Sequence, residues 1–197
     1  RFNFSSIGRI GHIINSSKGI WLGTSGNGLY QVTKTSIRNY TNRQNSFYSL
    51  SNNLVNHVFE DSKGQVWVGC NNGLNVQTDS GFVKVYLKQN EGSGYINSIT
   101  EDSKGVIWAS TNNGLVAYDP ENISDEYFTM KEGIGNLQFT ESSVLRKKDG
   151  NLLFGGNKGF TMFKPDKFVF NIYSPKVYIS DFYLFNEKVD IHNYSNI

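Results

Sequence analysis

The sequence predicts an all-β protein: a β-propeller of four antiparallel, four-stranded blades. Two observations carry this prediction. A Trp-centred segment recurs along the chain, and the runs between turns are filled with β-branched and aromatic residues that show no helical period. An antiparallel four-stranded unit that repeats about every 40 to 50 residues is the sequence signature of a propeller blade.

The recurring segment is clearest around Trp21, Trp67 and Trp108, which are spaced by 46 and 41 residues. A looser fourth copy places Leu153 at the same position after a further 45 residues. Each copy is followed by a glycine and an apolar residue, at Gly28-Leu29, Gly73-Leu74, Gly114-Leu115 and Gly159-Phe160. A Trp that holds one place in three blades indicates the core between sheets, although an aromatic face could also stack on a sugar.

The second copy shows the order of strands within one blade. Val55–Glu60 and Gln65–Cys70 are expected to form a hairpin across a four-residue turn, in which Asp61 can bond its own backbone and Gly64 can take a positive φ. The third and fourth strands are expected at Leu74–Gln77 and Phe82–Leu87.

Applied to the whole chain, this unit divides residues 1–166 into four blades at about 1–45, 46–90, 91–132 and 133–166. Residues 167–197 follow the four blades, and the family resemblance described below implies that they are a linker and the start of an immunoglobulin-like domain. The innermost strands are expected to include Ile10–Ile14, Val55–Phe59, Ile96–Thr100 and Ser142–Arg146.

The composition excludes several classes of protein. Nineteen Lys and Arg against 17 Asp and Glu leave a net charge of +2 with no run of like charges, so no nucleic-acid partner is expected. Cys70, the one cysteine, cannot form an internal disulfide, and no stretch approaches 18 consecutive apolar residues. Because Arg1–Phe4 lacks both an initiator Met and a signal-like apolar run, we expect the chain to be a piece of a longer protein.

The stretch Ser49–Gly69, followed by Gly73-Leu74, resembles the two-component regulator propeller repeat. That repeat builds the periplasmic sensor region of bacterial hybrid two-component sensor histidine kinases. Further copies resemble it at Ile96–Leu115 and Ser17–Leu29. Phe139–Pro165 is similar to the final blade of the family, and Ser174–Asn186 to the opening of its triple-tyrosine immunoglobulin-like domain.

The resemblance implies a ring of about seven blades, which four units cannot close. It therefore implies that the four blades form part of a larger ring, followed by the first strand of a β-sandwich. The two open sides are expected near Ile10–Ile14, with Phe2–Phe4, and near Phe160–Phe163, where Phe168–Phe170 could serve as an added strand or crossing linker. Exposed sheet edges recruit more chain, so the expected partners are the remaining blades and the immunoglobulin-like domain, with a homodimer in the intact sensor.

The polar loops at one end of the blades are the candidate ligand site. Asn and Gln offer donors and acceptors that suit neutral polyols, and Tyr or Arg could supply stacking or carboxylate contacts, although Asn-Gly pairs are also what tight turns require. The candidate residues are Arg43, Tyr48, Asn52, Asn53, Asn71, Asn72, Tyr95, Asn112, Asn113, Gln138, Asn157 and Lys158.

Signals for catalysis, metals and cofactors are weak. Adjacent carboxylates occur at Glu60-Asp61 and Glu101-Asp102, but neighbouring residues of a strand point to opposite faces, so a turn-forming Asp is favoured over an acid/base pair. His12 and His57 occupy equivalent places without a His or Cys at metal spacing, which argues against zinc and leaves a channel-lining role open. No catalytic residue, metal or cofactor is expected.

We therefore expect a non-enzymatic, periplasmic sensor module that binds an oligosaccharide and signals to a histidine kinase outside this chain. A propeller-fold lyase or hydrolase is the first alternative, and it would require ionisable groups that converge on neighbouring inner strands. A protein-interaction scaffold is the second, although the Trp-Asp ending of WD-type repeats is missing.

Overall fold

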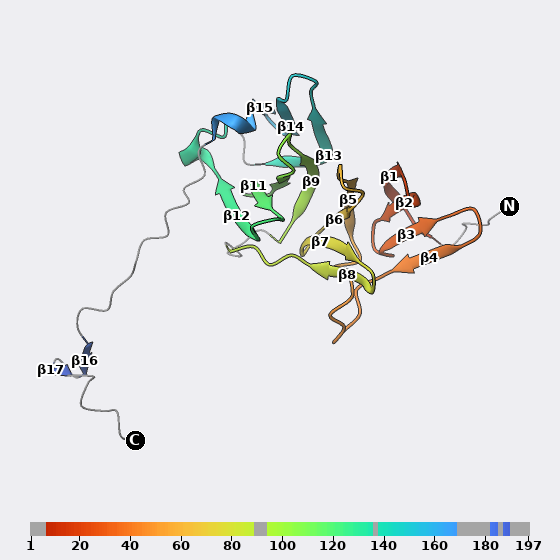
Figure 1. Cartoon of the computed structure of the whole chain (residues 1–197), viewed down its shortest axis with the longest axis horizontal. Helices are drawn as coiled ribbons and strands as arrows, with labels where there is room; N and C mark the ends of the chain where they lie inside the picture. Colours follow the sequence, from red (N-terminus) through yellow and green to blue (C-terminus); the bar gives the residue numbers. More distant parts are fainter. Residues whose placement is uncertain (1–6, 89–93, 136–137, 169–181, 185–186, 190–197) are drawn as a thin grey trace.

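The computed structural model describes residues 7–88, 94–135, 138–168, 182–184 and 187–189. Four antiparallel sheets are arranged as propeller blades, with the first strand of each sheet innermost (Figure 1). Within the described residues, the helical segments are two short 3₁₀ turns, η1 (Met130–Glu132) and η2 (Pro165–Lys167). The all-β, four-blade prediction is confirmed.

The first three blades each have four strands, and three strands of the fourth blade are described. From the inside outward, the first blade contains β1 (Ile10–Ser16), β2 (Gly19–Thr24), β3 (Leu29–Val32) and β4 (Ile37–Tyr40). The second contains β5 (Val55–Glu60), β6 (Val66–Cys70), β7 (Gly73–Thr78) and β8 (Gly81–Lys84). The third contains β9 (Ile96–Glu101), β10 (Ile107–Thr111), β11 (Gly114–Asp119) and β12 (Ser124–Phe128), and the fourth β13 (Phe139–Arg146), β14 (Leu152–Gly156) and β15 (Gly159–Phe163). A separate hairpin joins β16 (Phe182–Leu184) to β17 (Glu187–Val189).

The four predicted innermost strands are present as β1, β5, β9 and β13. Strand β13 is irregular because its pairing with β14 shifts between Phe139 and Val144, and Ser142 has a φ of 55°. The Ser142 hydroxyl donates to the carbonyl oxygen of Asn56 on β5 at 2.9 Å. The bulge therefore links the inner strands of the second and fourth blades.

The predicted turn aspartates are structural, and they have an additional partner. Asp102 Oδ1 accepts from the backbone nitrogens of Lys104 and Val106 at 2.8 and 3.1 Å. Its Oδ2 accepts from Trp108 Nε1 at 2.9 Å. Asp61 makes the same three bonds in the second blade, where Gly64 has the expected positive φ of 76°. Each aspartate thus closes its hairpin and holds the blade's Trp.

The glutamate before each aspartate connects neighbouring blades. Glu60 accepts from the backbone nitrogen and hydroxyl of Ser17, in the turn of the first blade, at 3.1 and 2.6 Å. Glu101 accepts from the same two groups of Ser62 in the second blade at 2.9 and 2.8 Å. The paired carboxylates are accordingly explained by blade assembly.

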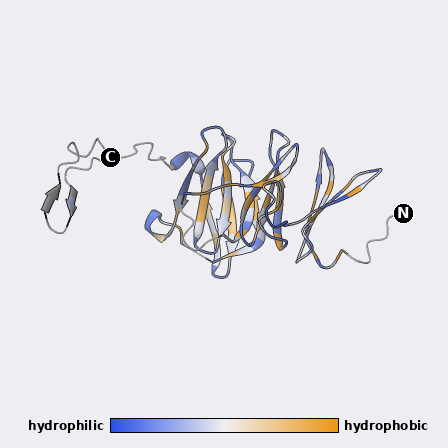
Figure 2. Cartoon of the chain, turned by 90° about the horizontal axis from the view of Figure 1, so that it is seen from below, coloured by the Kyte–Doolittle hydropathy of each residue, from blue (hydrophilic) through white to orange (hydrophobic). Residues whose placement is uncertain are grey.

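The hydrophobic cores lie between successive blades, where apolar strands face one another (Figure 2). Trp21, Trp67 and Trp108 are at most 2% exposed, and each packs against the following blade. The prediction that these residues form the core is confirmed. The chain after Lys84 leaves β8 earlier than expected, because Val85 and Leu87 pack into the core around Trp67.

The suggestion that Phe168–Phe170 covers the open side of the fourth blade is not supported at Phe168. This ring packs in the core between the third and fourth blades, 5.9 Å from Trp108 and 5.2 Å from Phe163 between ring centroids. Val169, Phe170, Phe2–Phe4 and most of Ser174–Asn186 lie outside the described residues.

Apolar side chains are exposed on the open faces of the first and fourth blades, the faces that no other described blade covers. In the first blade, Ile13 is 60% exposed. In the fourth, Leu145 and Met162 are 58% and 52% exposed on either side of Leu153, which holds the place of the Trp of earlier blades.

We expect the 197-residue chain to self-associate through these faces at tens of micromolar, burying on the order of 1,000 Å² or more per contact. Sedimentation velocity measures this directly. Replacing Met162 by Lys places a charge on the fourth blade's open face and should shift the population toward monomer. A well-folded wild-type monomer at that concentration would contradict the expectation.

Candidate functional site

Two of the candidate asparagines bond the side chains that connect one blade to the next. Asn71 Oδ1 accepts from Asn56 Nδ2 at 2.9 Å, and Asn56 Nδ2 also donates to the carbonyl oxygen of Ile96 in the next blade at 3.0 Å. Asn112 Oδ1 accepts from Asn97 Nδ2 at 3.0 Å in the same arrangement one blade further on. The structural interpretation of these Asn-Gly loops is favoured over ligand binding.

Other candidates have local roles. Asn52 Oδ1 accepts from the backbone nitrogen of Leu54 at 2.8 Å, and Asn53 Oδ1 accepts from that of Asn42 at 2.6 Å. Asn157 Nδ2 donates to Gln138 Oε1 at 3.4 Å. The remaining candidates in these loops are Asn72, Asn113 and Lys158, which are exposed, and Tyr95, which is half-buried.

A histidine pair lies on the inner strands. The rings of His12 and His57 have centroids 4.2 Å apart. His12 Nδ1 accepts from the backbone nitrogen of Val58 at 3.1 Å, and His57 Nδ1 accepts from that of Ile99 at 3.2 Å. Burial and the neighbouring His12 lower the pKa of His57 to about 3, and burial lowers the pKa of His12. Both rings are therefore neutral and joined to the following blade.

Acid is expected to destabilise the fold through His57. The unfolded ring titrates near its ordinary pKa of 6.5 and the folded one near 3, so the unfolded state binds more protons between these values. The stabilisation is complete above about pH 6.5 and is lost as the pH falls toward 3, by at most about 1.4 kcal/mol per pH unit for one group. Urea unfolding at stepped pH measures this slope.

The third blade offers a matched control for that experiment. Ser98 occupies the equivalent place, and its hydroxyl accepts from the backbone nitrogen of Ser143 at 2.8 Å. His57→Ser should fold and show a shallower decline below pH 6.5. An unchanged slope in this variant would show that other groups cause the acid sensitivity.

Metal and nucleophile chemistry find no support among the described residues. No three His, Cys, Asp or Glu side chains in that part of the chain come close enough to hold a metal ion. Burial raises the pKa of the Cys70 thiol to about 12, so it is protonated at neutral pH.

Within the described segments, no helix is long and apolar enough to span a membrane.

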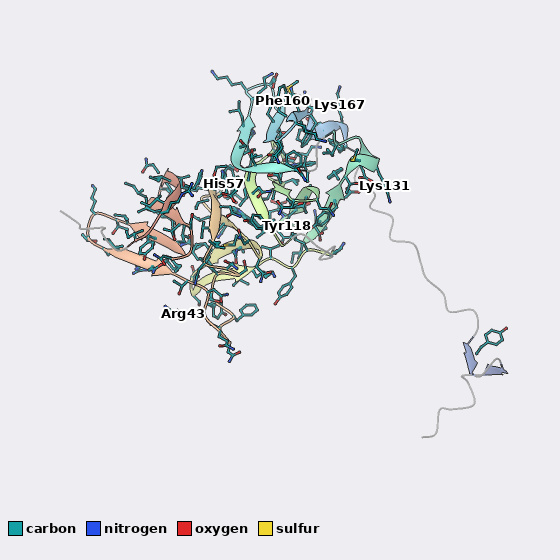
Figure 3. All side chains as sticks on the ribbon, turned by 180° about the vertical axis from the view of Figure 1, so that it is seen from behind. Arg43, His57, Tyr118, Lys131, Phe160 and Lys167 are labelled. Carbon is teal, nitrogen blue, oxygen red and sulfur yellow. The ribbon has the colours of Figure 1, made fainter. Side chains whose placement is uncertain are left out.

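Arg43 and Tyr48 come together at a groove of about 660 Å³ between the first and second blades. In Figure 3, Arg43 lies at the outer rim, whereas His57 lies toward the middle of the blades. A smaller hollow of about 300 Å³ is also lined by Arg43, together with Asn72. Polar residues that sequence reasoning did not single out also line the larger groove: Lys18, Gln31, Arg38, Gln65, Gln77 and Asp79.

Comparison with known proteins connects this architecture to proteins of bacterial two-component systems. The family model described as "Two component regulator propeller" matches residues 49–72 and 90–113. A 68-residue stretch is 43% identical to Histidine kinase P4 of Formosa agariphila, covering 33% of this chain and 5% of that protein.

Solved structures share the blade arrangement. The extracellular domain of a protein described as a hybrid two component system of B. thetaiotaomicron superposes with a TM-score of 0.69 and 26% identity, over 84% of this chain and 24% of that one. Virginiamycin B lyase from Staphylococcus aureus superposes with a TM-score of 0.61 and 21% identity, over 82% and 57% of the two chains. At that identity, the lyase shows likeness of fold alone.

The chain thus spans a small part of the relatives that it matches. Its repeats, its blade order and its likeness to an extracellular domain of a hybrid two component system agree with one another. Two stretches of the chain match the two-component regulator propeller repeat, and its blade architecture is similar to that of the extracellular domain of a hybrid two component system of B. thetaiotaomicron.

Proposed function

We propose that this chain is part of the extracytoplasmic, ligand-sensing region of a hybrid two-component sensor, and that its ligand is an oligosaccharide. The observation that carries the proposal is the match of two blades to the regulator propeller repeat, together with the likeness to an extracellular sensor domain. The amide- and hydroxyl-rich groove between the first and second blades supports binding of a polyol, because such groups both donate and accept.

Signalling requires that the ligand bind one arrangement of the assembly better than another, since equal affinity shifts no equilibrium. In this proposal the conformational change passes through an immunoglobulin-like domain to a kinase outside this chain. The intact sensor is proposed to be a homodimer in which further blades cover the open faces.

A thermal-shift panel of neutral and acidic oligosaccharides on the intact extracellular region tests the sensing function. We expect at least one saccharide class to raise the unfolding temperature in a concentration-dependent way. If no saccharide shifts the transition while the domain is folded, the oligosaccharide proposal fails.

A lyase or hydrolase remains the alternative from another class, and the site geometry argues against it. The two described inner-strand histidines use Nδ1 to hold the next blade. Glu60 and Glu101 are likewise bonded to neighbouring turns. Release of product from any of the panel saccharides would favour the enzyme instead.

A further inference from the structure

The repeated blades provide an internal comparison that singles out the groove. At the position of Gln77 in the second blade, the third blade has Tyr118 and the fourth has Phe163. Tyr118 packs on Trp67 with ring centroids 5.9 Å apart, and Phe163 packs on Trp108 at 4.9 Å. An aromatic ring therefore fills the interface between the second and third blades and the interface between the third and fourth. Between the first and second blades, the smaller Gln77 side chain leaves space.

The opposite wall of the groove differs in the same way. Across the first blade, Trp21 pairs with Gln31, which pairs with Arg38. The same row of the second blade is Trp67, Val76 and Val83. Polar and charged residues have thus replaced apolar ones on the wall that faces the hollow.

These polar side chains are held in place. Gln31 is 9% exposed, and its Nε2 donates to the carbonyl oxygen of Lys18 at 2.9 Å while its Oε1 accepts from the Tyr40 hydroxyl at 3.2 Å. Lys18 Nζ donates to Gln77 Oε1 at 3.0 Å, which connects the two blades. Beneath them, Phe82 lies 5.1 Å from Tyr40 between ring centroids. Gln31, Lys18 and Gln77 are thus held in position by bonds within the fold, which lowers the entropic cost of binding a ligand to them.

The charge of the lining is positive. Lys18, Arg38 and Arg43 line the groove against one carboxylate, that of Asp79. Guanidinium groups recognise planar carboxylates and sulfate-like oxyanions through paired hydrogen bonds. Tyr48, which is 52% exposed, offers a ring face beside them.

We infer that this groove binds an acidic oligosaccharide, with Arg38 and Arg43 contacting a carboxylate or sulfate and Tyr48 stacking on a sugar ring. The inference rests on the proposed sensing function and adds the ligand class and its place. A volume of about 660 Å³ is within the usual range for small-molecule sites, roughly 300 to 1,000 Å³.

Calorimetric titration of the intact extracellular region tests this inference with three probes. Trigalacturonate carries carboxylates, its fully methyl-esterified form has the same skeleton without charge, and a sulfated carrageenan oligosaccharide carries sulfate esters. We expect an acidic probe to bind, and the neutral ester to bind about 10- to 100-fold more weakly, the range expected for charged hydrogen bonds. The two acidic probes distinguish carboxylate from sulfate.

Variants copied from the other blades locate the binding site. Arg38→Val reproduces the second blade and should weaken acidic-probe binding about tenfold or more, whereas Gln77→Tyr reproduces the third blade, fills the groove and should abolish it. Lys34→Ala, an exposed cation of the first blade outside the groove, is the control and should bind as wild type. Unfolding temperatures confirm that each variant is folded.

The outcomes distinguish failure of the groove inference from failure of the proposed sensing function. Acidic-probe binding that survives both groove variants overturns the groove as the site. Binding of neutral saccharides alone overturns the acidic ligand class and leaves the sensing function standing. Absence of binding by every saccharide in the wider panel overturns both.

Discussion

Trp108→Ala is expected to lower the free energy of unfolding by about 3 to 5 kcal/mol, the range for truncating a fully buried aromatic side chain. Trp108 is 0% exposed and packs against Phe128 and Phe163 with ring centroids 5.2 and 4.9 Å away. The substitution also leaves Asp102 without its indole partner. Urea denaturation followed by circular dichroism measures the loss, and Trp67→Ala should behave similarly.

Phe47→Ala provides the matched control, because the Phe47 ring is 64% exposed and its removal should leave the midpoint nearly unchanged. A Trp108→Ala protein with wild-type unfolding but impaired saccharide binding would contradict the core assignment. Such a result would make the tryptophans stacking platforms.

Asp102→Ala is the second substitution with a large expected effect. The carboxylate is 4% exposed, and it satisfies two backbone donors and the Trp108 indole. Each buried donor left without a partner costs about 1 to 3 kcal/mol, so we expect a loss of about 3 kcal/mol or more in unfolding free energy.

The first blade indicates a milder replacement for comparison. Ser16 takes the aspartate's place there, and its Oγ accepts from Trp21 Nε1 and the backbone nitrogen of Lys18, both at 3.0 Å. Asp102→Ser should therefore recover part of the loss, and Asp149→Ala, at an exposed turn of the fourth blade, should change stability little. Equal effects of all three substitutions would show that burial and the Trp contact are not the cause.

The blades were predictable because their signals are local. In the second and third blades, an Asp and a Gly three positions further on specify the tight hairpin, and the Trp that follows identifies the buried strand. The register shift of β13 and the bond from Ser142 to Asn56 were not predictable, because they join residues of different blades.

The candidate site was predictable only in part. Arg43 and Tyr48 do line a groove, but several of the asparagines chosen for their polarity are occupied within loops or between blades. Lys18, Gln31 and Gln77 were missed because each looks like an ordinary exposed residue when one blade is considered alone. Comparison of equivalent positions between blades would have shown Gln77 where Tyr118 and Phe163 stand.

The bonds between blades also determine how the protein loses structure. The bond between Glu60 and Ser17 connects the second blade to the first, and the bond between Glu101 and Ser62 connects the third to the second. Such bonds join only immediate neighbours, so the stability of each blade depends on the blade beside it, as in a linear array of coupled repeats. Ser142 with Asn56 is different, because it joins the second blade directly to the fourth. We therefore expect the last three blades to unfold together and the first to open from the second at lower cost, at the junction that the groove occupies.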